Sequence, residues 1–158
     1  MTETRWLTAD EQRAWRAYLE ATNLLFDTLD RQLQQDAGIP HGYYEILVRL
    51  SESPDRMMRM SRLADLTRSS RSRLSHAVAR LEERGWVERI DCASDRRGQL
   101  AHLTDRGFAA LEEAAPGHVE TVHKHFIDPL TDEQVAQLAS IGEALIARLE
   151  RPGSSRES

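Results

Sequence analysis

The segment SSRSRLSHAVARLEERG, residues 69–85, has the pattern of a helix with two chemically different sides. Its apolar residues fall on one side at about 3.6 residues per turn, and such a stripe normally packs against a core. The other side has short hydroxyl, Arg and His side chains and no large apolar residue. Ser69 or Ser70 begins the helix and Gly85 ends it. The apolar residues are Leu74, Ala77, Val78 and Leu81, and the polar ones are Ser69, Ser72, Arg73, His76 and Arg80.

The polar side of this helix carries side chains that suit the major groove of duplex DNA. Arginine can pair bidentately with guanine, and a serine hydroxyl can reach several base edges. Arg68, Arg71 and Arg73 crowd the helix start, where the helix dipole favours an anion, so a DNA phosphate would satisfy both guanidinium groups and exposed amides. A solvated basic helix without a partner is the alternative. The candidate DNA contacts on this segment are Arg68, Ser69, Ser70, Arg71, Ser72, Arg73, His76 and Arg80.

A hairpin with a basic tip is expected directly after this helix. Residues 86–92 and 99–103 have the composition of two strands, and the residues between them form a polar turn. We expect Asp95 to pair with a neighbouring arginine, while Arg96 or Arg97 extends into a DNA minor groove, where the negative potential is deepest. An ordinary polar turn is the alternative, and the preceding arginine-rich helix favours the DNA contact.

Amphipathic segments precede this centre. Apolar residues at three-and-four spacing predict helices over about residues 9–35 and 41–51. A short strand containing Met57, Met58 and Met60 then leads to a third helix, which we expect Ser61 to cap. The residues of the second helix expected to face the core are Tyr43, Leu47 and Leu50.

Two further helices follow the hairpin. Thr104 is expected to cap the first of them, with Leu103 and Phe108 forming a hydrophobic staple around the cap. Pro129 interrupts that helix, and Thr131 and Gln134 then have the spacing of a capping box for the last one. The last helix carries an apolar stripe too long for so small a core to cover, which predicts dimerisation. The stripe consists of Leu138, Ile141, Leu145 and Leu149.

The order of these elements is that of a winged helix-turn-helix module embedded between helical arms. The expected fold class is mainly α with a small β-hairpin, a winged helix-turn-helix with N- and C-terminal helical dimerisation arms. We expect residues 1–38 and 107–150 to form the helical dimerisation region and residues 39–106 the DNA-binding module. Residues 151–158 are expected to be a disordered tail. A monomer that folds both arms onto its own module is the alternative.

Charge is distributed unevenly along the 158 residues. The formal net charge is -5, yet residues 56–106 contain twelve Arg against seven Asp or Glu, a local balance of +5 that leaves -10 for the rest. This pattern suggests that only the middle of the chain faces a polyanion. No apolar run approaches the roughly 20 residues that cross a bilayer, and the start lacks a secretion signal. We therefore expect a cytoplasmic protein without a membrane partner, in which the single Cys92 is structural.

Several short motifs together resemble the MarR family of bacterial transcription regulators. They are SRSRLS at residues 70–75, RLEERGWVER at 80–89, DRRG at 95–98 and LTDRG at 103–107. The resemblance covers nearly the whole chain. It implies a homodimer in which the first and last helices of both subunits intertwine. It also implies that two recognition helices and two wings bind a pseudo-palindromic DNA operator, usually to repress transcription.

Members of this family are often released from DNA by a small, commonly aromatic effector, so the resemblance implies a possible effector pocket. The pocket would lie between the first helix, the second helix and the DNA-binding module. Apolar walls with a few polar tips suit such a ligand, although the same residues could simply be core. The candidate residues are Trp15, Phe26, His41, Tyr43 and Tyr44.

Other functional classes have weaker support in the sequence. A zinc site could be built from three histidines, His118, His123 and His125. On a helix, however, His123 faces a different direction from the other two. We therefore expect solvated histidines and no metal site. No nucleophile with a base and no phosphate loop is evident, so we predict neither an enzyme nor a bound cofactor. A helical protein-interaction module without specific DNA binding is the main rival. The salt dependence of duplex DNA affinity would separate the two functions.

Overall fold

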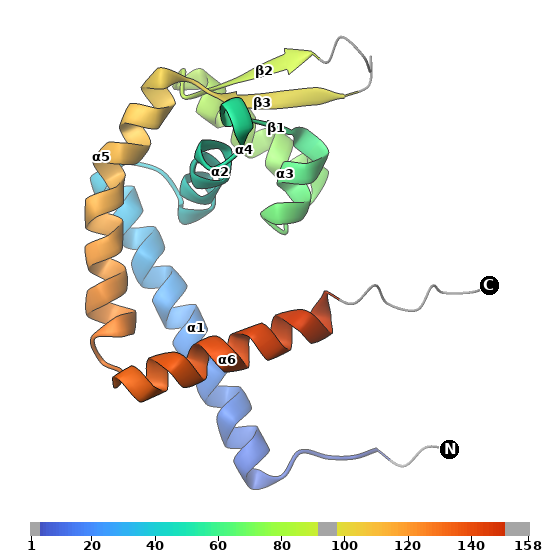
Figure 1. The fold of residues 1–158 in the computed structure, drawn as a ribbon, viewed down its shortest axis with the longest axis vertical. Coiled ribbons are helices and arrows are strands. Elements are labelled where there is room, and N and C mark those ends of the chain that lie inside the picture. Colours follow the sequence, from blue (N-terminus) through green and yellow to red (C-terminus); the bar gives the residue numbers. More distant parts are fainter. Residues whose placement is uncertain (1–3, 92–97, 151–158) are drawn as a thin grey trace, which may run out of the picture. The chain divides into compact units, whose positions relative to one another are not determined.

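A computed structural model describes residues 4–91 and 98–150 of the chain (Figure 1). The described residues form two compact units, one up to Glu120 and one from Thr121 onward. The predicted wing-tip contacts Asp95, Arg96 and Arg97, together with Cys92 and the predicted tail, lie outside the described residues. Among the helices that the structure describes, none combines the length and apolar character that crossing a membrane requires.

The first unit begins with the long helix α1 (Ala9–Asp36). Its start is fixed by a capping box, in which the Glu11 amide donates to Thr8 Oγ1 at 3.2 Å and the Thr8 amide donates to the Glu11 carboxylate at 2.8 Å. Only Leu29 and Leu33 of this helix are buried. Most of α1 therefore contributes no residue to the core of its own unit.

Helix α2 (His41–Ser51) has the predicted bounds and packs through a broader face than predicted. Leu47 and Leu50 are buried and Tyr43 packs against the core, as expected, and Tyr44 and Ile46 are buried as well. Tyr43 is only half-buried. Tyr43 and Tyr44 lie four and three residues before Leu47, so spacing along the helix does not separate them. Tyr44 is the one whose ring packs against His118 of the helix after the sheet.

The residues after α2 form a turn, a strand and a short helix. These elements are η1 (Pro54–Arg56), β1 (Met57–Arg59) and α3 (Met60–Leu66). The predicted cap at Ser61 is wrong, because the N-cap position is Arg59 and Met60 is already helical rather than part of the strand. Thr67 and a left-handed Arg68, with φ of 51°, then connect α3 to the next helix.

The hairpin strands are β2 (Val87–Asp91) and β3 (Gln99–Leu103), and both lie where the sequence predicts them. The sheet has a third strand, because β1 pairs antiparallel with the other side of β3 and gives the order β1-β3-β2. In register, Met57 faces His102 across one pair and Val87 faces Leu103 across the other. The predicted fold class, a mainly α winged helix-turn-helix with a small β-hairpin, is confirmed, and β1 adds a third strand to the hairpin.

Helix α4 (Arg71–Glu83) buries the predicted stripe. Leu74, Val78 and Leu81 are at most 1% exposed and lie in one core with residues of α2, α3, β3 and α5. Beyond its end, Arg84 donates to the Gly38 carbonyl at 2.7 Å. The Gly38 carbonyl lies just after α1, so this hydrogen bond joins the end of α4 to the end of α1.

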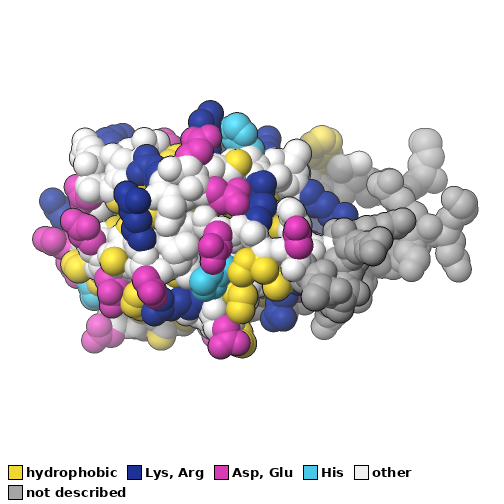
Figure 2. All heavy atoms as spheres, turned by 90° about the horizontal axis from the view of Figure 1, so that it is seen from above, with side chains coloured by type: hydrophobic (Ala, Val, Ile, Leu, Met, Phe, Trp, Pro, Cys, Tyr) yellow, Lys and Arg dark blue, Asp and Glu magenta, His cyan; other side chains and the backbone are white. Residues whose placement is uncertain are grey.

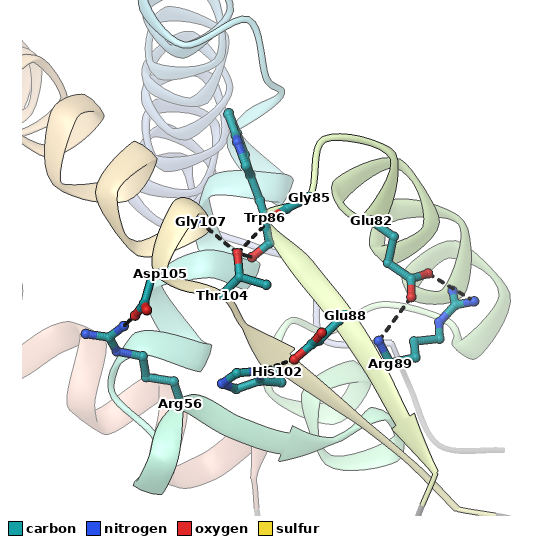
Figure 3. Close-up of polar contacts among 10 residues, drawn as sticks. All are labelled: Arg56, Glu82, Gly85, Trp86, Glu88, Arg89, His102, Thr104, Asp105 and Gly107. Carbon is teal, nitrogen blue, oxygen red and sulfur yellow. Dashed lines mark hydrogen bonds and ion pairs between the residues drawn. The ribbon is translucent and has the colours of Figure 1, made fainter.

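Helix α5 (Asp105–Val122) starts at a tightly packed junction with the sheet (Figure 3). Thr104 Oγ1 accepts from the Gly107 amide at 3.0 Å and donates to the Gly85 carbonyl at 2.7 Å. Thr104 therefore caps the helix as predicted and also binds it to the turn after α4. Gly107 is required there, because an added Cβ would overlap the Trp86 carbonyl and would lie 2.8 Å from Leu103 Cδ1.

The second unit contains the π-helical segment η2 (His123–Ile127) and helix α6 (Asp132–Leu149). The predicted capping box is confirmed, with the Gln134 amide donating to Thr131 Oγ1 at 3.2 Å and the Thr131 amide donating back to Gln134 at 3.0 Å. Along α6, all of which the structure describes, no residue is buried. Val135 and Leu138 are half-buried and line a groove with Phe126, whereas Leu145 and Leu149 are exposed.

Candidate nucleic-acid interface

The start of α4 resolves which serine caps the predicted recognition helix. Ser70 is the N-cap, and its Oγ accepts from the Arg73 amide at 3.3 Å. The Ser70 and Ser72 hydroxyls also lie 3.3 Å apart. Ser69 is half-buried, and its amide donates to the Ala64 carbonyl at 3.0 Å, which joins the turn to α3.

The first two turns of α4 present a polar and exposed face. From Ser70 to Ala77 every residue except the core residues Leu74 and Ala77 is exposed. No ion pair between described residues uses the guanidinium of Arg71 or Arg73. Both cations lie at the positive end of the helix dipole, where two positive charges are unfavourable in the absence of an anion. The exposed residues are Ser70, Arg71, Ser72, Arg73, Ser75 and His76.

Arg80 differs from the other predicted contacts because its charge is already paired. Its Nη1 lies 2.9 Å from a Glu83 carboxylate oxygen, and that hydrogen bond raises the pKa of Arg80. Arg80 also lines a cavity of about 390 Å³ that includes Tyr43 and Arg84. The structure thus groups Arg80 with residues of α2 and with the end of α4 rather than with the exposed first turns.

A small cavity brings the recognition helix and the base of the wing together. It has a volume of about 240 Å³ and is lined by Arg71 and Ser75 of α4, Arg59 and Ser61 near the start of α3, and Gly98 beside β3. The first turns of α4, the start of α3 and Gly98 beside β3 therefore border one site. The arginines of the face in Figure 2 are interspersed with acidic side chains, so the case for DNA binding depends on α4 itself.

Arg89 on β2 braces α4, a role that the sequence analysis did not find. Its Nη2 donates to the Ser75 carbonyl at 2.6 Å. Its Nη1 lies 3.4 Å from the Glu82 carboxylate (Figure 3). The Arg89 amide also donates to Glu82 at 3.0 Å. Ser75 and Glu82 are seven residues apart, two helical turns, and so lie on one face. A serine and a glutamate seven residues apart on the helix, followed by an arginine on the next strand, form the sequence signal that could have revealed this contact.

Two more polar contacts fix the sheet in place. His102 Nδ1 lies 2.7 Å from a Glu88 carboxylate oxygen, and these residues are direct partners on β3 and β2. Arg56 Nη1 lies 3.1 Å from Asp105, and its guanidinium carbon lies 3.8 Å above the centre of the Phe108 ring. The first pair joins the two wing strands, and the second joins the turn before β1 to the start of α5 (Figure 3).

Three of the predicted effector-pocket residues lie in one aromatic cluster. The ring of His41 is 5.4 Å from that of Phe26 and 5.8 Å from that of His118, and His118 is 4.6 Å from Tyr44. Trp15 is 53% exposed and takes part in none of these ring pairs. Tyr43, adjacent to Tyr44, faces the cavity beside Arg80 instead.

The prediction that His118 is a solvated helix histidine is wrong. Its Nδ1 is buried and has no hydrogen-bond partner among the described residues. Burial, with a smaller contribution from His41, lowers the pKa of His118, and burial raises the pKa of Tyr44. His123 and His125 are exposed as expected. The tertiary contact with α2 explains the difference, because it cannot be read from spacing along one helix.

Comparison with known proteins agrees with this architecture. The sequence model of the MarR family matches residues 37–98. The crystal structure of Sco3205, a MarR family transcriptional regulator from Streptomyces coelicolor in complex with DNA, is 54% identical, with a TM-score of 0.90 over 98% of this chain and 97% of that one. AbsC, another MarR family transcriptional regulator from Streptomyces coelicolor, is 45% identical, with a TM-score of 0.87 over 94% of this chain and 100% of that one.

A more distant curated relative extends the comparison to another organism. The transcriptional repressor MprA of Escherichia coli is 29% identical over 114 residues, which are 72% of this chain. The match spans 64% of the length of that relative. The likeness to Sco3205, by contrast, extends over almost all of both chains at 54% identity. The chain therefore belongs to the MarR family of transcriptional regulators.

Proposed function

We propose that the protein binds a pseudo-palindromic duplex DNA operator as a homodimer and regulates transcription from it. The observation that carries this proposal is the exposed polar face on the first two turns of α4, which holds Arg71 and Arg73 without intramolecular ion pairs between described residues. A DNA backbone would supply the missing anion, and the grooves would supply base edges. The DNA complex of Sco3205 supports this reading, because that relative is similar over nearly the full length.

The predicted DNA contacts divide into three groups under this proposal. Ser70, Ser72, Arg71, Arg73 and His76 are the candidates for the major groove and its flanking phosphates, with Arg68 and Ser69 at the turn before them. Asp95, Arg96 and Arg97 remain the proposed contacts of the wing. Arg80 is a weaker candidate, because binding a phosphate would require its guanidinium to leave Glu83.

The homodimer is supported by apolar surface on both arms. On α6, Ile141 is 56%, Leu145 is 45% and Ile146 is 54% exposed, and on α1 Trp15 and Tyr18 are more than half exposed. Contiguous apolar faces on helices need a partner to be stable in water. We propose that residues 1–38 and 107–150 supply the dimer interface and that residues 39–106 supply the DNA-binding module.

Repression and release by a small aromatic effector complete the proposal. MprA, to which the chain is similar over 72% of its length, is a transcriptional repressor. The cluster of Phe26, His41, Tyr44 and His118 offers aromatic walls and an unsatisfied ring nitrogen, features that a small aromatic ligand with a polar group can use.

Selection of bound sequences from a random duplex library with the purified full chain tests this function. We expect enrichment of a two-fold symmetric site whose half-sites are about one helical turn apart. The affinity for that site should fall steeply with salt, because each phosphate contact releases a counterion. Failure to enrich any sequence at low salt would contradict DNA recognition and favour a helical protein-interaction module.

A further inference from the structure

We propose that the ring cluster between α1, α2 and α5 opens in mild acid and thereby lowers the affinity of the protein for its operator. The inference rests on the proposed function, and it adds a regulation of operator binding that needs no ligand. The cluster consists of Phe26, His41, Tyr44 and His118.

The cluster joins the two regions to which we assign different tasks. His41 and Tyr44 lie in the first turn of α2, in the proposed DNA-binding module. Phe26 and His118 lie on α1 and α5, in the proposed dimerisation region. Helix α2 shares one core with α4, so the ring contacts help to set where α4 stands relative to α1 and α5. A dimer that binds two half-sites about one helical turn apart needs that placement to be fixed.

His118 lies where a positive charge is unfavourable. Its Nδ1 is buried and has no hydrogen-bond partner in the part of the chain that the structure describes. Its ring centre is 4.6 Å from that of Tyr44 and 5.8 Å from that of His41. Burial and, to a smaller extent, His41 lower the pKa of His118. The intact cluster therefore favours a neutral ring, and a proton on His118 favours an opened cluster in which water reaches the ring.

The charged groups around His118 do not offset its burial. On α2 it faces His41 and Tyr44, and neither side chain is negatively charged near neutral pH. On α1, Asp30 and Asp36 are already hydrogen-bonded, the first to the His41 amide and the second to a glutamine one turn earlier, each at 2.8 Å. The residues three and four positions from His118 on α5 are uncharged, namely Ala114, Ala115, Thr121 and Val122.

The binding of one proton limits the size of the effect. In an opened cluster His118 would regain its ordinary pKa of 6.5. At pH 5.5, one unit lower, a single such group favours the opened state by at most about tenfold relative to pH 7.5. We therefore expect acid to weaken operator binding by about three- to tenfold through His118. His118→Phe keeps a ring at this position but cannot bind the proton, so this part of the response should disappear.

Fluorescence anisotropy of the full chain on the selected operator, at pH 7.5 and pH 5.5, tests this expectation. The ratio of the two dissociation constants should be about three- to tenfold larger for the unmodified chain than for His118→Phe. His125→Phe, at an exposed histidine, is the matched control and should behave like the unmodified chain. The comparison between chains cancels the protonation of His76 on α4, which all of them share. Equal ratios for the unmodified chain and His118→Phe would overturn the proposal.

NMR of the unmodified chain gives a second test that needs no variant. Because coupling between two binding events is reciprocal, operator binding should lower the pKa of His118 further. Without DNA, the nuclear Overhauser contacts between the His118 and Tyr44 rings should weaken with the same midpoint as the His118 titration. An unchanged His118 pKa on the operator, or ring contacts that persist through the titration, would overturn the proposal. Absence of operator binding at pH 7.5 would instead contradict the proposed function, and the titration without DNA would still decide whether the cluster opens.

Discussion

Thr104 and Gly107 show what the LTDRG motif does at the scale of single residues. The threonine hydroxyl caps α5 and bonds back to the turn after α4, and the glycine lets the first turn of α5 rest against the Trp86 carbonyl. Both residues therefore hold α5 against the start of β2. The motif is structural, because it positions the wing strands relative to α5.

Gly107→Ala should destabilise the protein by about 2–3 kcal/mol, because the new methyl group has to displace backbone at Trp86. Gly42→Ala is the matched control, since nothing lies within 4 Å of a Cβ added there and alanine favours helix. Urea unfolding at one fixed protein concentration measures both changes. Equal stability of the two variants would contradict the close packing at the α5 start.

His118 makes folding stability depend on pH. Its pKa in the folded protein is lowered from the ordinary 6.5 by burial and by His41, so the unfolded chain binds more protons in the window just below 6.5. The free energy of unfolding should therefore fall as the pH drops through that window. Replacement by His118→Phe should flatten this fall, and His125→Phe, at an exposed histidine, should not. Unfolding curves between pH 7.5 and about 5 provide the measurement.

At the scale of elements, the position of α4 depends on the brace from β2. Arg89 contacts two turns of the helix at once, through the Ser75 carbonyl and the Glu82 carboxylate. Its side chain is 24% exposed, so solvent screens the ion pair only in part. A loose α4 would present its polar face to DNA in many orientations rather than one.

Arg89→Ala should cost about 1–2 kcal/mol of stability and should also weaken operator binding, although Arg89 itself need not touch DNA. A double-mutant cycle with Glu82→Gln measures the coupling between the two side chains. If the two substitutions changed the free energy of unfolding additively, Arg89 and Glu82 would not be energetically coupled. Arg13→Ala on α1 serves as the surface control.

The elements that the sequence predicts well are those with local signals. The bounds of α2, β3 and the start of α6 follow from periodicity, turn residues and a capping box. The pairing of β1 with β3, the brace at Arg89 and the ring contacts of His118 are tertiary, and no pattern within one element specifies them. The helix start at Met60 was missed because Ser61 offered a stronger cap signal than Arg59.

The candidate DNA-binding face was predictable for the same reason. The buried stripe of α4 fixes the rotation of the helix, and the exposed residues follow from it. The sequence could not show that Glu83 pairs with Arg80, although their three-residue spacing permits it. It also could not separate Tyr43 from Tyr44, because two adjacent aromatic residues both border an apolar stripe.

At the scale of the whole molecule, the exposed apolar residues of α6 predict association through the arms. Leu145→Glu should shift the protein from dimer to monomer at micromolar concentrations, because it places a charge within a desolvated interface. Ala136→Glu is the control, since that residue is exposed and lies half a turn around the helix from Leu145. Sedimentation equilibrium gives the mass. An unchanged dimer in Leu145→Glu would place the interface elsewhere.

The central claim is that the exposed face of α4 contacts DNA, and a salt titration of operator binding by Arg73→Ala tests it most directly. Fluorescence anisotropy on the selected duplex should show a loss of about 1–3 kcal/mol if Arg73 reads a base, or a salt slope lower by about 1 if it contacts a phosphate. Arg13→Ala should match the unmodified chain. Unchanged affinity and unchanged salt slope for Arg73→Ala, and likewise for Arg71→Ala, would contradict the account.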